Sequence, residues 1–260
     1  MNLLELFSGT HSIGKVAEKK GYKVYSVDRD LDDKDPFGSK YKSFKHFKED
    51  ILTWNYKQYQ PHFFKIITAS PVCLWWSNLR NCWIGRKLNG KIVTKESLLE
   101  DINTFGKPMV DKVREIIDYF KPEFYWIENP QTGKMKKYIT DLPFFDVDYC
   151  KYTDWGYKKR TRFWTNIKDF KPKTCYQDCI NIITYSTGQK KHRNNLAANN
   201  QKKVGDVIIN CNTKKLREKY KDVKPMKNCG TCGTKLDRYR IPPIIIEELL
   251  QCCQKKKVIQ

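Results

Sequence analysis

The sequence predicts an α/β protein in which helices cover a parallel central sheet, with a small basic insertion. Short apolar runs alternate with helical patterns through the first half of the chain, as they do in repeated β-α-β units. A length of 260 residues is enough for one such domain and a modest insertion. Hydrophobic residues make up 40% of the chain and aromatic residues 13%, which excludes a globally disordered protein.

The first β-α-β unit occupies the N-terminal 27 residues. The apolar run 3–7 predicts a strand, and a helical pattern then extends to Lys20 and ends at Gly21. Residues 22–27 predict the second strand.

Further elements continue this alternation. Residues 63–69 and 124–127 predict buried strands, and a helix over 107–120 ends before Pro122. Two shorter strands are expected at 145–150 and 162–165. A last helix opens at Pro242-Pro243 and packs back on the sheet. In such a fold, ligands bind at the carboxyl ends of the strands.

The net positive charge is unevenly distributed along the chain. Lysine and arginine outnumber acidic residues by 21 overall, and residues 168–235 hold 16 basic against 5 acidic side chains. Such a field attracts a polyanion, most simply nucleic acid, although solubility or adhesion to a membrane surface would also explain it. We expect a core domain at 1–167, a basic cysteine-containing insertion at 168–236 and a returning C-terminal helix at 237–260. Lys190, Lys191 and Arg193 are candidate nucleic-acid contacts of the insertion.

No run reaches the length of a membrane span, and the N-terminus lacks the features of a signal peptide. We therefore expect an intracellular protein. In a reducing compartment, the 10 cysteines serve packing, nucleophilic catalysis or metal binding rather than disulfides.

The turn Phe7-Ser8-Gly9-Thr10 joins the first strand to the first helix, where backbone amides and a positive helix end are offered to a ligand. It is not the dinucleotide fingerprint, because no Gly-x-Gly pair is present. Asp28 ends the second strand, where a carboxylate can accept both ribose hydroxyls of a nucleoside cofactor. A plain βα turn and a capping carboxylate are the alternatives.

Cys73 lies directly after the strand 63–69, in the loop that begins Ser70-Pro71-Val72-Cys73. It is either a buried thiol or a nucleophile, since nearby cations stabilise a thiolate and bind phosphate. The same loop offers a group of candidate nucleic-acid contacts: Ser77, Arg80 and Arg86. Its Trp75, Trp76 and Trp83 stack on bases, close the pocket, or belong to the core.

Glu128 follows the apolar run 124–127, and therefore faces the same crevice as Cys73. A buried glutamate is either paired with an arginine, Arg160 or Arg162, or binds a protonatable ring nitrogen.

Four further cysteines predict a structural zinc site in the basic insertion. Cys229 and Cys232 have the spacing of a zinc knuckle, and Cys175 and Cys179 form a looser pair. Cys211 or His192 can replace one of these ligands, and unpaired thiols are the alternative.

In this order, the motifs resemble those of the DNA (cytosine-5) methyltransferase family, and most of all its compact members from phages and large DNA viruses. The resemblance covers residues 3–166 and 238–250. The matching elements are the cofactor loop Leu6-Phe7-Ser8-Gly9-Thr10, the ribose acid Asp28, the adenine-side pair Asp50-Ile51, the nucleophile loop Pro71-Val72-Cys73 with Ser77, the glutamate motif Glu128-Asn129, the Arg160-Thr161-Arg162 element and the last motif Ile241-Pro242-Pro243.

The resemblance implies a Rossmann-like class I fold that binds S-adenosylmethionine through the cofactor loop, Asp28, Asp50-Ile51 and Pro71. It also implies that a monomer transfers the methyl group to C5 of a cytosine flipped out of double-stranded DNA. Cys73 would form the covalent adduct, Glu128 would hold the ring, and Arg160 and Arg162 would assist. Four departures from the family pattern bear on the shape of the cofactor loop and on the rate, more than on the reaction class: His11, Val72, Leu74 and Lys159.

Two other functions stay open. One is a nucleic-acid-binding protein with weak or absent catalysis, but Cys73 and Glu128 would be unnecessary in it. The other is methylation of cytosine in RNA, such as tRNA. Restriction-modification with a partner endonuclease, protection of a viral genome and regulation are all compatible with the sequence.

Overall fold

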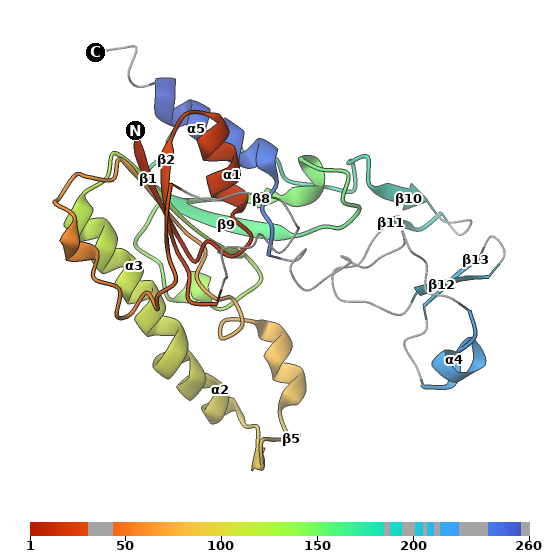
Figure 1. Cartoon of the computed structure of the whole chain (residues 1–260). Helices are drawn as coiled ribbons and strands as arrows, with labels where there is room; N and C mark the ends of the chain where they lie inside the picture. Colours follow the sequence, from red (N-terminus) through yellow and green to blue (C-terminus); the bar gives the residue numbers. More distant parts are fainter. Residues whose placement is uncertain are drawn as a thin grey trace. The chain divides into compact units, whose positions relative to one another are not determined.

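The computed structural model describes residues 1–30, 44–184, 188–193, 201–204, 207–210, 214–223 and 239–255. The chain forms two compact units (Figure 1). The first comprises residues 1–147, 161–172 and 243–260, and the second comprises residues 148–160 and 173–242. Residues 148–160, which the sequence assigned to the catalytic core, thus group with the basic insertion.

The first unit is built on a seven-stranded sheet in the order β3-β2-β1-β4-β7-β9-β8. Six of its strands lie close to the expected positions: β1 (Asn2–Leu6), β2 (Lys23–Val27), β4 (Ile66–Ala69), β7 (Phe124–Pro130), β8 (Phe144–Asp148) and β9 (Arg160–Thr165). The edge strand β3 (Lys45–Phe47) had no predicted range. The five strands from β3 to β7 are parallel, which confirms the mixed α/β class.

The sheet is mostly rather than wholly parallel, because β9 runs antiparallel to β7. Between β8 and β9 the chain forms the short turn η5 (Tyr149–Lys151).

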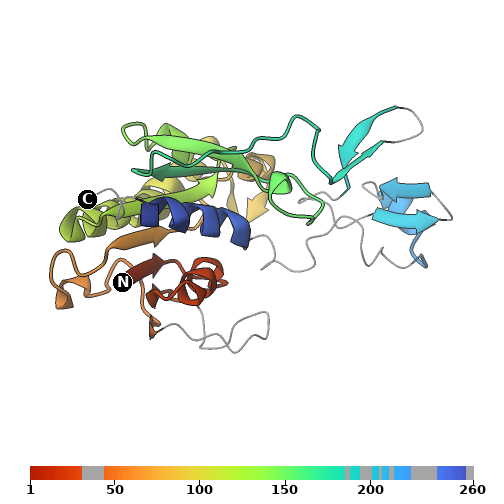
Figure 2. The same ribbon diagram turned by 90° about the horizontal axis from the view of Figure 1, so that it is seen from above.

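Helices cover both faces of the sheet (Figure 2). α3 (Lys107–Phe120) buries Val110, Val113, Ile116 and Phe120 in one apolar cluster with Leu4, Ile67 and Ile127 of the strands. On the other face, α1 (Ser12–Lys19) lies beside α5 (Pro243–Lys255). The helix predicted at 107–120 and the returning C-terminal helix are both confirmed.

The stretch after Cys73 is more ordered than the loop that the sequence predicted. It forms η2 (Asn78–Trp83), a hairpin of β5 (Lys87–Leu88) and β6 (Lys91–Ile92), α2 (Lys95–Asp101) and the π-turn η3 (Ile102–Gly106). Asn89 and Gly90 turn the hairpin with positive φ angles, as a tight two-residue turn requires.

Trp76 belongs to the core, which settles one of the alternatives left open for the loop tryptophans. A Cβ atom on Gly106 would lie 3.0 Å from the indole of Trp76, so glycine lets η3 approach this ring closely. Trp75 instead stacks on Phe105, with ring centroids 4.7 Å apart.

The remaining elements are short. η1 (Tyr56–Gln58) and η4 (Met135–Lys137) belong to the first unit. In the described residues of the second unit, β10 (Ile182–Thr184) pairs antiparallel with β11 (Lys190–His192), β12 (Gln201–Val204) pairs antiparallel with β13 (Val207–Asn210), and α4 (Lys214–Lys219) follows. Among the helices of the described ranges, none combines the length and apolar character needed to cross a membrane.

Candidate active site at the carboxyl edge of the sheet

The predicted cofactor loop leaves β1 in a tight turn. Phe7, Gly9 and His11 all have positive φ angles, of 56°, 47° and 51°. His11 replaces the glycine that the family pattern has, and it adopts the left-handed conformation that glycine favours. Its ring lies edge-on to His46, with centroids 5.5 Å apart. The departure at His11 therefore keeps the backbone turn and adds a buried ring.

Glu5 holds the end of this loop where α1 begins. The sequence analysis did not identify it. Its buried carboxylate accepts hydrogen bonds from the backbone amides of Ile13 and Gly14, both at 3.1 Å. These amides open α1, where a negative charge is favoured by the helix dipole. An acidic residue inside an apolar strand was the feature of the sequence that could have identified Glu5.

Asp28 binds the cofactor loop directly. Its Oδ2 accepts from the amide of Gly9 at 3.0 Å, and its Oδ1 accepts from the amide of Asp30 at 2.9 Å. The capping alternative is thus present, and each oxygen keeps a further lone pair for a ligand. Asp50, which follows β3, binds Arg29 at 3.3 Å and caps the backbone at Leu52. The neighbouring Ile51 is buried.

These residues fit a nucleoside cofactor. The loop of residues 7–10, Asp28, Asp50-Ile51 and Pro71 follow β1, β2, β3 and β4, which are neighbouring parallel strands. They therefore share one edge of the sheet. Ser8 adds a buried hydroxyl whose Oγ has no hydrogen-bond partner within the described residues. A buried polar atom of this kind is normally satisfied by a ligand or water.

Cys73 follows β4, and Glu128 lies within the adjacent parallel strand β7, one residue beyond the pair of Ala69 with Ile127. Cys73 is half-buried, whereas Glu128 is only 5% exposed. The buried side chain of Asn129 donates a hydrogen bond to the carbonyl of Pro71 at 2.7 Å. The motif that bears the carboxylate is thereby tied to the loop that bears the thiol.

Arg160 and Arg162 are both engaged by aspartates. Arg160 binds Asp148 through two hydrogen bonds of 3.0 and 2.7 Å, and Arg162 binds Asp146 through two of 2.7 and 2.9 Å. Each arginine considered as a partner of Glu128 thus binds an aspartate through two hydrogen bonds.

The strand register also separates Arg162 from Glu128. Arg162 lies opposite Asn129, and Phe163 lies opposite Glu128. Since side chains alternate along a strand, Arg162 and Glu128 leave opposite faces of the sheet. The catalytic roles of both arginines stay predictions.

The basic loop residues differ in their surroundings. Arg80 is only 7% exposed, pairs with Asp101, and has its guanidinium 5.1 Å from the Trp75 ring and 5.7 Å from the Trp83 ring. This arrangement packs the loop, while Nε and Nη1 of Arg80 are buried without a hydrogen-bond partner among the described residues. Ser77 caps η2 by accepting from the amide of Leu79, whereas Arg86 is exposed.

The predicted contacts of the second unit lie on and after β11. Lys190 and Lys191 are exposed, and Arg193 donates to the carbonyl of Asp154 at 2.6 Å. Cys175 and Cys179 meet Cys150 and His192. Cys229, Cys232 and Cys211 lie outside the described residues.

Sequence reasoning missed Cys150, which it placed in a strand, and gave His192 only as a substitute. The spacing Cys175-x3-Cys179-x12-His192 was a visible pattern, but the contribution of Cys150 depends on the fold.

A relative from Frog virus 3 (isolate Goorha), the probable DNA (cytosine-5)-methyltransferase, is 39% identical over 258 residues, which cover 97% of this chain and 100% of the viral protein. No family model matches the chain. An E. coli putative DNA modification methyltransferase encoded within a prophage is 16% identical, with a TM-score of 0.37, over 78% of this chain and 58% of that one. The Entamoeba histolytica methyltransferase EhMeth is 16% identical, with a TM-score of 0.44, over 66% and 55%.

This chain thus spans a little over half of each of these two solved proteins, at 58% and 55%. The viral relative matches from end to end, and its identity of 39% carries the assignment. This chain belongs to the DNA (cytosine-5)-methyltransferase family.

Proposed function

We propose that this protein transfers a methyl group from S-adenosylmethionine to C5 of cytosine in double-stranded DNA, with Cys73 as nucleophile. The observation that carries the proposal is the placement of Cys73 after β4 and of Glu128 near the end of the adjacent parallel strand β7, with the two segments joined by the hydrogen bond from Asn129 to Pro71. The similarity to the probable DNA (cytosine-5)-methyltransferase of Frog virus 3 supports DNA as the substrate.

Cys73 would solve the main chemical difficulty. Cytosine C5 is a weak nucleophile, and addition of a thiolate to C6 converts the ring into an electron-rich enamine. S-adenosylmethionine supplies an electrophilic methyl group, which C5 takes while S-adenosylhomocysteine is left behind. Loss of the C5 proton to solvent then drives the electron pair back into the ring and expels the Cys73 thiolate.

Glu128 would stabilise the ring while it accepts the thiolate. Its carboxyl group, buried at the end of β7, can hydrogen-bond N3 and the exocyclic amine of cytosine. Thymine presents neither the amine nor an unprotonated N3, so the same contact favours cytosine. Because the target ring is stacked inside a duplex, it must first leave the helix, at a cost of a few kcal/mol.

The cofactor residues would hold the donor beside this pair. Asp28 accepts the ribose hydroxyls, Ile51 packs against the adenine, and the Ser8 hydroxyl and loop amides receive the polar tail. Glu5 keeps these amides in place through its bonds to α1.

Tritium transfer from labelled S-adenosylmethionine tests the reaction. The full-length protein is incubated with duplex DNA, with tRNA or with no polymer. We expect label on DNA, no label in Cys73→Ala, and a loss of about 10²–10⁴-fold in Glu128→Gln, as for other acid–base groups. Cys82→Ser, an exposed cysteine on the same loop, should keep full activity.

The covalent step has its own readout. Duplex DNA that contains 5-fluorocytosine should trap the protein as a denaturant-stable complex, because fluorine cannot leave as a proton does. Cys73→Ala should form no such complex. Label on tRNA alone would replace the proposed substrate, and cofactor binding without transfer to either polymer would reduce the protein to a binding module.

A further inference from the structure

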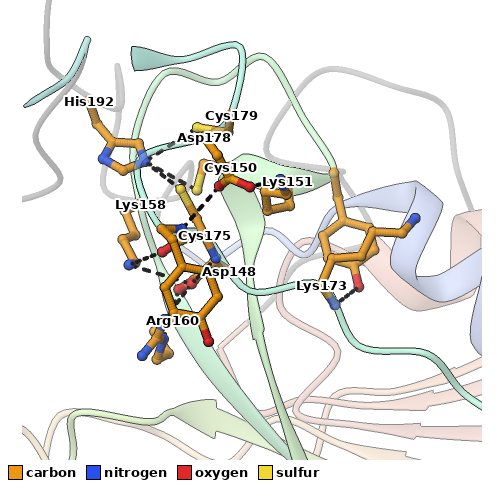
Figure 3. A network of polar contacts seen from close by, with 12 residues as sticks. Asp148, Cys150, Lys151, Lys158, Arg160, Lys173, Cys175, Asp178, Cys179 and His192 are labelled. Atoms are coloured by element: carbon orange, nitrogen blue, oxygen red, sulfur yellow. Dashed lines mark hydrogen bonds and ion pairs between the residues drawn. The ribbon is translucent and has the colours of Figure 1, made fainter. Parts of the chain in front are cut away.

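We propose that the second unit binds a structural zinc ion through Cys150, Cys175, Cys179 and His192. The four ligand atoms lie within 4.8 Å of one another, and they come from three separate segments of the unit. Figure 3 shows the three sulfur atoms and the imidazole ring turned toward a common point.

The distances match a tetrahedral metal site. His192 Nε2 lies 3.3 Å from the sulfur of Cys150, 3.5 Å from that of Cys175 and 3.4 Å from that of Cys179. With zinc–sulfur distances of about 2.3 Å and zinc–nitrogen distances of about 2.0–2.1 Å, tetrahedral geometry separates a sulfur from a nitrogen ligand by about 3.6 Å. The observed spacing is thus close to that of ligands around a shared zinc ion.

Hydrogen bonding does not account for this cluster. A neutral imidazole nitrogen carries either one hydrogen or one lone pair, so it makes one good hydrogen bond. Here a single nitrogen faces three sulfurs at nearly equal distances. A cation at the centre would satisfy all four atoms together. Three thiolates and an imidazole form a soft, closed donor set, which selects zinc and leaves no position for substrate.

Asp148 holds the ligand segments on one side. It is fully buried, and its Oδ2 accepts from the Cys175 amide at 2.7 Å, while its own amide donates to the carbonyl of Lys173 at 3.0 Å. Arg160 binds both carboxylate oxygens, and Lys158 donates to the carbonyl of Cys175 at 2.9 Å. These bonds bring the Cys175 segment to the end of β8 (Figure 3).

Asn181 holds the other side. Its buried side chain donates to the carbonyls of Cys150, at 3.0 Å, and Thr153, at 2.7 Å, and accepts from the amide of Gly156 at 3.0 Å. Its carbonyl accepts from the amide of Arg193, next to His192, at 2.8 Å. Outer contacts of this kind orient metal ligands in zinc proteins.

The charge around the cluster suits a zinc ion with three thiolates, which carries one net negative charge. Lys158 lies 3.5 Å from Asp148, and Lys151 binds Asp178 at 2.8 Å, beside Cys179. The described part of the unit buries few apolar side chains, so a metal ion would supply the cross-link that a small core does not.

Metal analysis of the full-length protein tests the proposal. Protein purified under reducing conditions should contain about one zinc ion per chain, as expected for a single closed site. Cys150→Ser and Cys179→Ser should lose it, whereas Cys82→Ser, with an exposed cysteine of the first unit, should retain it. A double variant of Cys229 and Cys232 should also retain it, which separates this site from the pairing that the sequence suggested.

Cobalt substitution gives a readout that does not depend on activity. Cobalt(II) in the site should produce the visible bands of tetrahedral coordination and strong thiolate charge-transfer absorption. His192→Cys should keep the metal with increased charge-transfer intensity, whereas His192→Ala should weaken binding. This pair guards against a variant that simply fails to fold.

Three results would overturn the proposal. The first is a folded wild-type protein, checked by circular dichroism, that contains no zinc and takes up no cobalt. The second is zinc that survives Cys150→Ser but is lost with Cys229 and Cys232. The third is a disulfide among Cys150, Cys175 and Cys179 in protein isolated under reducing conditions.

Discussion

Different interactions stabilise the interior of each of the two units. In the first, strands and helices bury a continuous apolar cluster that runs from Leu4 to Trp164. In the described part of the second, buried Asp148 and Asn181 bind backbone groups, and three thiols converge on one imidazole. The stability of this chain therefore has two sources, apolar burial in the first unit and polar contacts with the cysteine–histidine cluster in the second. We expect them to respond to different perturbations.

The largest effect should come from metal removal. Treatment with a chelator and a thiol reagent should expose the backbone amides of residues 148–160 and 173–184, because structural zinc contributes about 10–16 kcal/mol of binding free energy in zinc-finger peptides. The amides of α3 should keep their protection. Hydrogen exchange measured by mass spectrometry resolves the two regions, and simultaneous loss of protection in α3 would show that the units are not separable.

A mutation that creates a cavity in the apolar cluster should destabilise the first unit and leave the second unaffected. Phe120 is fully buried and packs against Phe64 with ring centroids 4.9 Å apart. Phe120→Ala should lower the free energy of unfolding by about 3–5 kcal/mol in urea denaturation, while the zinc content stays unchanged. Leu79→Ala, at an exposed site, is the control and should change stability little.

Two similar arginine–aspartate pairs, one in each unit, allow a direct comparison by mutation. Asp148→Asn leaves the Arg160 guanidinium without its bidentate partner and weakens the anchor of Cys175. We expect a loss of about 3 kcal/mol, as when one member of a buried pair is removed, together with weaker zinc retention. Asp146→Asn disrupts the matching pair with Arg162 and should leave zinc retention unaltered. Equal effects of both variants on zinc would contradict the anchoring role of Asp148.

A smaller effect is expected at the cofactor loop. Glu5→Gln removes one of the two oxygens that accept from the amides of Ile13 and Gly14, which should cost about 1–2 kcal/mol, a typical value for a helix cap. Affinity for S-adenosylmethionine, measured by calorimetry, should fall because the loop precedes these amides. Glu18→Gln, exposed on the same helix, should leave both quantities unchanged.

The smallest expected effect is a loss of stability in alkali within the first unit. Burial, with a hydrogen bond to Glu115, raises the pKa of Tyr56 to about 12, and burial with Asp111 raises the pKa of Tyr138 to about 12. In the unfolded chain these phenols ionise near the ordinary tyrosine pKa of 10.0, so stability from this source is complete below that pH and is lost as the pH rises to about 12. Urea denaturation across this range should show a weaker pH dependence in the double variant of Tyr56→Phe and Tyr138→Phe; an unchanged slope would contradict these shifts.

The contrast between the units also explains what the sequence could predict. Helix 107–120 was correctly bounded because Pro108 lies in its first turn and Pro122 follows its end. The strands of the sheet stood out as apolar runs, and their order placed Cys73 and Glu128 at one edge. Periodicity reports the burial of apolar faces, which is how the first unit folds.

Polar contacts between residues far apart in the sequence produce no periodic pattern that could be recognised in advance. The pairing of Arg160 with Asp148, and the approach of Cys150 to His192, join residues 12 and 42 positions apart. The antiparallel direction of β9 and the ordered stretch after Cys73 likewise depend on tertiary contacts, such as the stacking of Trp75 on Phe105.

The bond between Asn129 and Pro71 has a consequence for substrate binding. Because Asn129 adjoins Glu128 and Pro71 lies two residues before Cys73, movement of either reactive group strains a buried contact. An incoming nucleotide would therefore meet both groups already positioned, and binding energy would not be consumed in assembling them. In the proposed reaction, that energy would stay available for moving the target base out of the double helix.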